Sequence, residues 1–269
     1  MTASAPVIMD QVARGNAALI AYLPVGFPSV DGSIQAAQVL LDNGVDVIEL
    51  GFPYSDPAMD GPVIQQATTR ALERGVHLED LFRAVSELSA SGAPILSMTY
   101  WNPVHWYGVE RFARDFARAG GAGLITPDLP PEEGGDWTAA SDKYGLERVY
   151  LAALSSTEER LRIISEASDG WVYAASTMGV TGTRSWVDAR LEELVGRTRA
   201  AGAETVCVGL GVSTGEQARS IGTYADAVIV GSAFVKPLLE QEFDEALVRM
   251  AELARELRAG VDGARKGRD

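Results

Sequence analysis

The chain has 269 residues, of which 46% are hydrophobic, and its formal net charge at pH 7 is −14. A chain of this length can bury a full hydrophobic core, whereas its acidic balance argues against nucleic acid, whose binding requires a basic face. The single cysteine, Cys207, excludes an internal disulfide and favours a reducing compartment, and with only two histidines a zinc site of the usual kind is nearly excluded.

Eight short apolar runs punctuate the sequence, and most of them are continuous rather than alternating. Continuous runs are typical of strands that are covered on both faces in a parallel sheet. In chain order the runs are Ala18–Tyr22, Val45–Leu50, Pro94–Tyr100, Gly123–Thr126, Arg148–Ala153, Trp171–Ala175, Thr205–Val208 and Ala227–Val230.

Segments with helical spacing and good helix formers lie between these runs. They include Ile34–Leu41, Leu78–Leu88, Glu110–Ala119, Glu158–Ala167, Leu191–Ala200 and Glu216–Ile221. Ser155–Glu159 and Ser213–Glu216 have the N-cap residue and acidic first turn of a helix start. Gly44 and Gly202 follow predicted helix ends, where glycine is the favoured residue.

This alternation predicts an α/β protein that folds as one (β/α)8 TIM barrel, with a short N-terminal helix before the first strand. A doubly wound open sheet is the alternative, but no Gly-x-Gly-x-x-Gly motif opens the first helix after a strand. No linker divides the chain, so we expect residues 1–269 to form a single domain. About the first 6 and the last 10 residues are expected to be flexible.

Two connections after predicted strands are longer than the others. One follows the second strand, from Gly51 to about Pro62, and the other follows the sixth, from Ser176 to about Asp188. In TIM barrels such loops lie at the carboxyl ends of the strands, where active sites are built, so we expect these two to be lids or binding loops.

The second strand and its loop carry three carboxylates. Glu49 interrupts the apolar run, and Asp56 and Asp60 follow it. A charged side chain in a buried strand is costly unless it is paired or has a function, and a buried acid beside an acid-bearing loop suits general acid–base chemistry. The alternatives are structural: Glu49 accepts hydrogen bonds from neighbouring amides only, and Asp60 belongs to an Asp-Gly-Pro turn.

Three glycine-rich turns, Met178–Thr183, Gly209–Ser213 and Val230–Ala233, follow the last three predicted strands. Glycine lets the backbone approach an anion closely, and helix N-termini supply free amides and a favourable dipole. Any one of these turns is more often a tight connection between a strand and a helix, but together they predict a phosphate site. The expected donors are Gly182, Gly211, Gly231 and Ser232.

Three tyrosines, Tyr22, Tyr100 and Tyr173, lie at the ends of the first, third and sixth predicted strands. One such aromatic is usually part of the core, whereas three around the same mouth favour a flat apolar ligand. Asp128, in the Pro-rich loop after the fourth strand, is a further carboxylate whose expected role is to order that loop.

From about Asn16 to Leu239 the chain resembles the tryptophan synthase alpha chain family. The longest matching motif is Glu49-Leu-Gly-Phe-Pro-Tyr-Ser-Asp-Pro-Ala-Met-Asp-Gly-Pro62. The others are Met98–Pro103, Pro127–Pro131, Gly179–Gly182, Gly209–Gly211 and Val230–Ala233. Their order and spacing make the resemblance specific, although each glycine turn alone would be a weak signal.

The resemblance implies cleavage of indole-3-glycerol phosphate to indole and glyceraldehyde 3-phosphate, with Glu49 and Asp60 as the catalytic pair. It also implies pairing with a beta chain in an alpha2-beta2 heterotetramer, with pyridoxal phosphate on the beta chain and no cofactor on this chain. It places the phosphate on the four predicted donors, and it places in the substrate pocket Tyr22, Tyr100, Tyr173 and Thr181.

Three other functions are compatible with a phosphate-binding barrel. A synthase of indole-3-glycerol phosphate would need catalytic lysines at strand ends, but the first lysine is Lys143 and none lies in a strand run. A free-standing lyase that releases indole without a beta chain would use the same chemistry. A barrel that only activates a partner is disfavoured, because both acids are present.

The sequence carries no sign of export or membrane insertion. Residues 1–6 lack the basic region and long apolar segment of a secretory signal. No apolar run approaches the roughly 20 residues that a membrane span requires. We therefore expect a cytoplasmic protein that contacts neither membranes nor nucleic acid.

Overall fold

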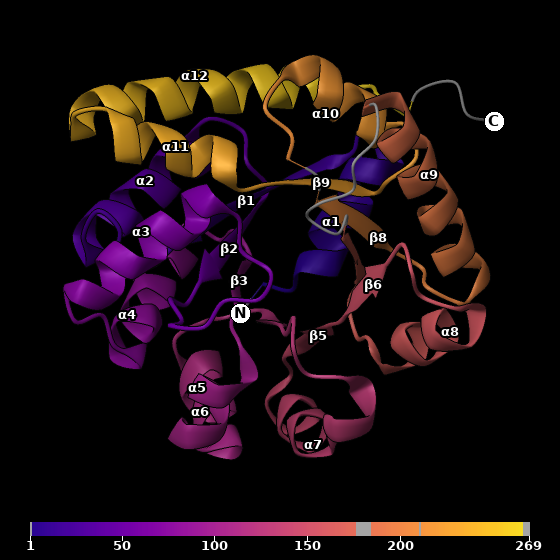
Figure 1. Ribbon diagram of the computed structural model, residues 1–269, viewed down its shortest axis with the longest axis horizontal. Helices are drawn as coiled ribbons and strands as arrows, with labels where there is room; N and C mark the ends of the chain where they lie inside the picture. The colour runs from indigo at the N-terminus through magenta and orange to yellow at the C-terminus, as the bar shows by residue number, and fades with distance from the viewer. Residues whose placement is uncertain (1, 176–183, 210, 266–269) are drawn as a thin grey trace.

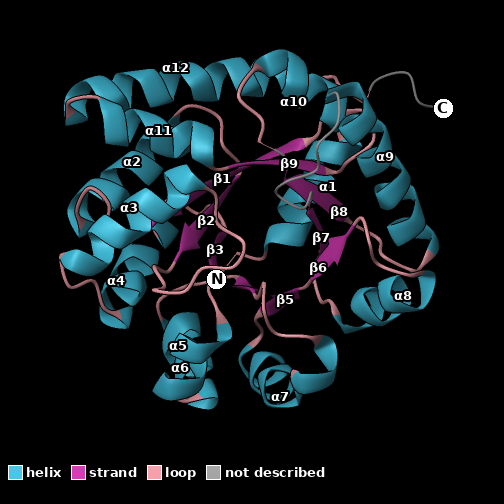
Figure 2. Ribbon diagram, in the orientation of Figure 1, coloured by secondary structure: helices cyan, strands magenta, loops and turns pink. Residues whose placement is uncertain are grey.

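A ring of parallel strands surrounded by helices forms the core of the computed structural model, which describes residues 2–175, 184–209 and 211–265 (Figures 1 and 2). This arrangement confirms the predicted α/β class and TIM barrel. Within the described residues the strands are β1 (Ala18–Pro24), β2 (Val47–Gly51), β3 (Ile95–Met98), β4 (Gly123–Ile125), β5 (Glu147–Val149), β6 (Leu151–Ala153), β7 (Val172–Ala175), β8 (Val206–Gly209) and β9 (Ala227–Val230).

Helices connect successive strands, and side chains cap several of them where the sequence predicts a helix start. Thr157 accepts from the amide of Arg160, and Thr214 accepts from the amide of Gln217. The helices are α1 (Ser4–Ala13), α2 (Val30–Asp42), α3 (Pro62–Glu73), α4 (Leu78–Ser89), α5 (Trp101–Tyr107), α6 (Val109–Arg118), the 3-10 turn η1 (Pro131–Glu133), α7 (Gly135–Tyr144), α8 (Glu158–Ala167), α9 (Arg184–Ala200), α10 (Gly215–Gly222), α11 (Ser232–Glu240) and α12 (Phe243–Val261).

The predicted strand Arg148–Ala153 forms two short strands, β5 and β6, on either side of Tyr150. β5 pairs with β4, whereas β6 pairs with β7, and the carbonyl of Tyr150 accepts from the amide of Tyr173 at 3.0 Å. The two strands are therefore halves of one barrel strand, and the barrel closes where the chain passes from one neighbour to the other.

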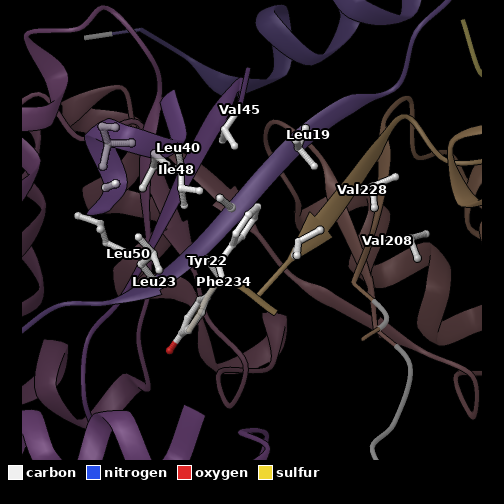
Figure 3. Close-up of a cluster of buried hydrophobic side chains, with 14 of the residues drawn as sticks. Leu19, Tyr22, Leu23, Leu40, Val45, Ile48, Leu50, Val208, Val228 and Phe234 are labelled. Carbon is white, nitrogen blue, oxygen red and sulfur yellow. The ribbon is translucent and has the colours of Figure 1, made fainter. Parts of the chain in front are cut away.

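Alternate residues of each strand face the inside and the outside of the barrel. The outward residues, such as Leu19, Ile48 and Val228, pack with side chains of the surrounding helices, and Figure 3 shows part of this cluster. The inward residues form a separate apolar layer that contacts Ile8 of α1, and this layer includes Ala18, Ile20, Val47, Leu96, Ile125, Val149, Trp171, Cys207, Ala227 and Ile229. Helix α1 thus closes the amino-terminal end of the barrel.

Helix α1 is fastened to the barrel through one buried carboxylate. Glu147 accepts from the amide and the hydroxyl of Ser4, at 3.1 and 2.5 Å, and from the amide of Ala5 at 2.9 Å. The indole N–H of Trp171 donates to the Ser4 hydroxyl oxygen at 2.9 Å. The helix therefore begins within the N-terminal segment that we expected to be flexible. At the other end, residues 266–269 lie outside the described part of the chain.

We expect Glu147→Gln to lower the free energy of unfolding by about 1–3 kcal/mol, because in either orientation the new NH2 group would face at least one of the three donors instead of accepting from it. Urea unfolding followed by circular dichroism measures the change. Glu133→Gln on the exposed turn η1 is the matched control and should unfold like the unsubstituted chain. Equal stability of the Glu147 and Glu133 variants would show that α1 is held by packing alone.

Candidate active site

Polar side chains replace the apolar ones in the next inward layer, toward the carboxyl ends of the strands. Tyr22 of β1 and Glu49 of β2 are direct neighbours in the parallel register. Tyr173 of β7 lies in the same layer across the barrel, where burial and then the charge of Glu49 raise its pKa well above the ordinary value. The alternation of side chains that forms the inward apolar layer therefore also brings three predicted site residues together in the barrel interior.

The two tyrosine rings extend over glycines that end the adjacent strands. A Cβ atom at Gly51 would lie 2.1 Å from the hydroxyl oxygen of Tyr22, and one at Gly209 would lie 2.2 Å from that of Tyr173. Figure 3 shows the Tyr22 hydroxyl projecting beyond the edge of the apolar cluster. Any larger residue at either glycine would displace a ring, so these glycines shape the mouth of the barrel.

Glu49 is a buried acid whose environment favours its protonated form. Its side chain is 1% exposed, and its Oε2 atom has no hydrogen-bond partner among the residues that the structure describes. Burial, followed by the negative charge of Asp60, raises the pKa of Glu49 from 4.5 to about 8. The carboxyl is therefore protonated at neutral pH and able to donate a proton.

Asp60 lies in the loop between β2 and α3 and is partly buried. Burial raises its pKa from 3.8 to about 6, so it ionises before Glu49 as the pH rises. Its charge also contributes, after burial, to the raised pKa of Tyr22. Two nearby carboxyls whose environments separate their pKa values in this way suit an acid–anion pair.

Tyr100 occupies a different position from the one the sequence predicts. Strand β3 ends at Met98, and Tyr100 is the N-cap residue of α5 rather than a strand end. Its hydroxyl accepts from the amide of Met59, next to Asp60, at 2.9 Å, and its ring stacks on Tyr54. Tyr100 thus contacts the loop of the second carboxylate directly.

The predicted phosphate donors are only partly within the described residues. Gly231 is the N-cap residue and Ser232 the first residue of α11, where the first-turn amides have no partner within the helix. Gly211 has a φ of +32°, and a Cβ atom there would meet nothing within 4 Å. Thr181 and Gly182, with most of the predicted second loop, lie outside the described residues.

The described residues contain neither a metal-binding cluster of the usual kind nor a helix that could span a membrane. No group of three or more His, Cys, Asp or Glu side chains is placed there to hold a metal ion. No helix in the described ranges is long and apolar enough to cross a membrane. Asp128 orders its loop as expected, because its Oδ1 atom accepts from the amide of Trp101 at 2.8 Å.

The match to known proteins covers nearly the whole chain. A family profile described as tryptophan synthase alpha chain matches residues 8–262. The chain belongs to this family. The tryptophan synthase alpha chain of Leifsonia xyli subsp. xyli is 58% identical over 253 residues, which cover 92% of this chain and 97% of that relative. The relative from Streptomyces coelicolor is 54% identical and covers 93% of both chains.

Solved structures of tryptophan synthase alpha chains have the same fold. A chain of tryptophan synthase from Mycobacterium tuberculosis superposes with a TM-score of 0.90 at 51% identity, covering 97% of this chain and 99% of that one. Tryptophan synthase subunit alpha from Legionella pneumophila superposes with a TM-score of 0.86 at 29% identity, covering 96% and 97%. The family therefore retains this barrel across a wide range of sequence identity.

Several residues at the site of this chain are not predicted from the sequence. The sequence places Gly209 in a glycine-rich turn and Gly51 at the start of a long loop, but it does not predict that tyrosine rings pack over them. It gives no role to Tyr54 or Gln65. The signal available in retrospect is spacing: Gly51 lies two positions beyond Glu49 and therefore on the same face of the strand. Nothing local marks Tyr54 or Gln65.

Proposed function

We propose that this chain, like the family to which it belongs, cleaves indole-3-glycerol phosphate to indole and glyceraldehyde 3-phosphate, with Glu49 and Asp60 as its catalytic residues. The observation that carries the proposal is the buried carboxyl of Glu49, whose Oε2 atom has no partner among the described residues and which is protonated near neutral pH beside an acid of lower pKa. A retro-aldol cleavage needs such an acid, because the indole ring must first be converted into an electron acceptor.

In the first step, Glu49 donates its proton to carbon 3 of the indole ring, and the positive charge spreads to the ring nitrogen. The ionised carboxylate of Asp60 stabilises that charge at the ring N–H. Glu49, now a carboxylate, then accepts the proton of the hydroxyl on the adjacent glycerol carbon. The bond from that carbon to ring carbon 3 breaks, its electron pair restores the aromatic ring, and an aldehyde forms. Glu49 ends the cycle protonated, as it began.

The remaining parts of the site would hold the two ends of the substrate. The rings of Tyr22 and Tyr173 flank Glu49 and offer flat apolar faces to the indole. The first-turn amides of α11, at Gly231 and Ser232, offer donors and the positive end of a helix dipole to the phosphate. Gly182 and Thr181, from the second loop, are proposed to complete the phosphate site and the contact to Asp60.

We also propose that indole passes to a beta chain in an alpha2-beta2 assembly, with pyridoxal phosphate bound by the beta chain. The cleavage itself needs only carboxyl groups of this chain, so we expect it to require no added cofactor. The test is to supply the purified chain with indole-3-glycerol phosphate, with and without a purified tryptophan synthase beta chain, and to quantify both products. Equal amounts of indole and triose phosphate, formed faster with the partner, support the proposal.

Two other results of this assay would change the proposal. Fast indole release that ignores the beta chain would identify a free-standing lyase. The absence of both products in either condition would show that the intact acids do not cleave this substrate.

Gly211→Val is expected to raise KM for indole-3-glycerol phosphate at least tenfold and to lower kcat much less. A valine at a φ of +32° strains the backbone that should face the phosphate, and its side chain would enter the open space beside it. Steady-state kinetics measures both constants. Gly202→Val is the control, because Gly202 also has a positive φ, of +110°, and lies at the opposite end of the barrel, between α9 and β8. An unchanged KM would remove Gly211 from the phosphate site.

A further inference from the structure

The loop that carries Asp60 is fastened on both sides of that residue. The amide of Met59 donates to the Tyr100 hydroxyl oxygen at 2.9 Å, and the side-chain amide of Gln65 donates to the carbonyl of Asp60 at 2.9 Å. Tyr54, earlier in the loop, stacks on Tyr100 with ring centroids 5.0 Å apart and an interplanar angle of 24°. Tyr100 therefore holds the loop through one hydrogen bond and one aromatic contact.

Tyr100 itself is held by neighbouring parts of the barrel. It is 6% exposed and caps α5, whose first amide, that of Trp101, donates to Asp128 at 2.8 Å. The Trp101 ring packs edge to face against Trp137 of α7, with centroids 6.5 Å apart. Asp128 lies in the loop after β4 and Trp137 is fully buried in α7, so the start of α5, and with it Tyr100, is held both by a neighbouring loop and by the core.

We propose that Tyr100 is a positioning residue, whose hydroxyl and ring hold the Met59–Asp60 segment so that the Asp60 carboxylate faces Glu49 at the mouth of the barrel. This role differs from the one that the sequence predicts for Tyr100, which is to form part of the substrate pocket. Its effect on turnover rests on the proposed function, whereas its effect on Asp60 does not. A loop outside regular structure gains order only from such contacts, and a partly buried hydrogen bond contributes more than an exposed one.

The electrostatics of the site provide a readout specific to this role. The titratable groups that face Asp60 are Tyr22 from β1, Glu49 from β2 and Tyr100, and burial is the cause of its raised pKa. If the tether is lost, the loop samples positions in which the Asp60 carboxylate is hydrated. Its pKa must then fall toward the ordinary value. A change in general stability would not move this pKa while the chain stays folded.

The test is Tyr100→Phe, which keeps the stacked ring and removes the hydroxyl acceptor. We expect the pKa of Asp60 to fall by roughly 1 pH unit, a tenfold change in its acid dissociation constant. Carbon-13 NMR of the carboxyl groups measures it, with the Asp60 signal assigned by its absence from Asp60→Asn. We also expect kcat for cleavage to fall roughly 3- to 10-fold, with KM nearly unchanged, because the proposed phosphate donors lie on other loops.

Tyr107→Phe is the matched control. It also removes a tyrosine hydroxyl that makes a hydrogen bond, in that case to Asp115 at 3.0 Å on the outer helices. It should leave the pKa of Asp60 and the turnover unchanged. As a second check, Tyr100→Phe added to Asp60→Asn should change kcat less than twofold, because the residue to be positioned no longer carries its charge.

The outcomes separate this proposal from the proposed function. An unchanged Asp60 pKa in Tyr100→Phe overturns the positioning role, whatever the wild-type turnover. A full 3- to 10-fold loss of kcat in the Asp60→Asn background also overturns it. If the wild-type chain does not cleave the substrate while the Asp60 pKa falls as expected, the proposed function fails and the positioning role stands.

Discussion

Glu49→Gln should lower kcat for cleavage of indole-3-glycerol phosphate by at least about 100-fold, the usual loss when a general acid–base is removed. Glutamine has nearly the same shape as the protonated carboxyl that burial favours here, so the fold should be retained. It cannot release a proton to the ring or accept one from the glycerol hydroxyl. Rapid-quench measurement of indole formation in a single turnover isolates this step from product release.

Glu147→Gln is the matched control for this variant, because it is the same substitution at another buried glutamate, at the opposite end of the barrel. At a temperature where both variants are folded, Glu147→Gln should cleave at the wild-type rate. Affinity for glycerol phosphate, measured by calorimetry, should survive in Glu49→Gln, because the proposed phosphate donors are untouched. A rate of cleavage by Glu49→Gln within a few-fold of the wild-type rate would show that Glu49 is not the proton donor.

Asp60→Asn should lower kcat by roughly 100-fold, the loss typical of removing one group that stabilises charge in the transition state. It should also change the pH dependence in a defined direction. The Asp60 charge adds to the burial that raises the pKa of Glu49, so without it the Glu49 pKa falls. The alkaline limb of the kcat/KM profile should therefore move to lower pH, and the acid limb should disappear.

Asp56→Asn is the control for loss of charge in the same loop. Asp56 is exposed, and its carboxylate accepts from the hydroxyl of Ser55 at 2.6 Å rather than facing the barrel. Both limbs of its pH profile should match those of the wild-type chain. An alkaline limb that stays in place in Asp60→Asn would show that the two carboxyls do not interact.

Much of the barrel follows from local pattern. Continuous apolar runs locate the strands, and the helix starts at Thr157 and Thr214 lie within the predicted capping segments. Glu49 can be recognised as a candidate because an acid in such a run has few structural explanations. Period-two alternation then places Tyr22 and Glu49 on one face once their strands are known to be adjacent.

The parts that sequence reasoning misses are contacts between distant residues. Tyr100 and Met59 are 41 residues apart, and their hydrogen bond depends on the path of an irregular loop that has no periodic signal. Ser4 and Glu147 are 143 residues apart, so the anchoring of α1 is invisible in local composition. The strand breaks at Tyr150 because its first half, β5, pairs with β4, whereas its second half, β6, pairs with β7. This break is a property of barrel closure and not of the apolar run Arg148–Ala153 itself.

The most direct test of the acid–anion pair is the pH dependence of kcat/KM for cleavage of indole-3-glycerol phosphate by the unsubstituted chain. Cleavage requires Asp60 ionised and Glu49 protonated, so the profile should be bell-shaped, with its maximum between the pKa of about 6 for Asp60 and about 8 for Glu49. Because the two carboxyls interact, the two limbs report the pair rather than each residue alone. A profile that rises steadily to alkaline pH, or no cleavage at any pH, would contradict the assignment of Glu49 as the proton donor.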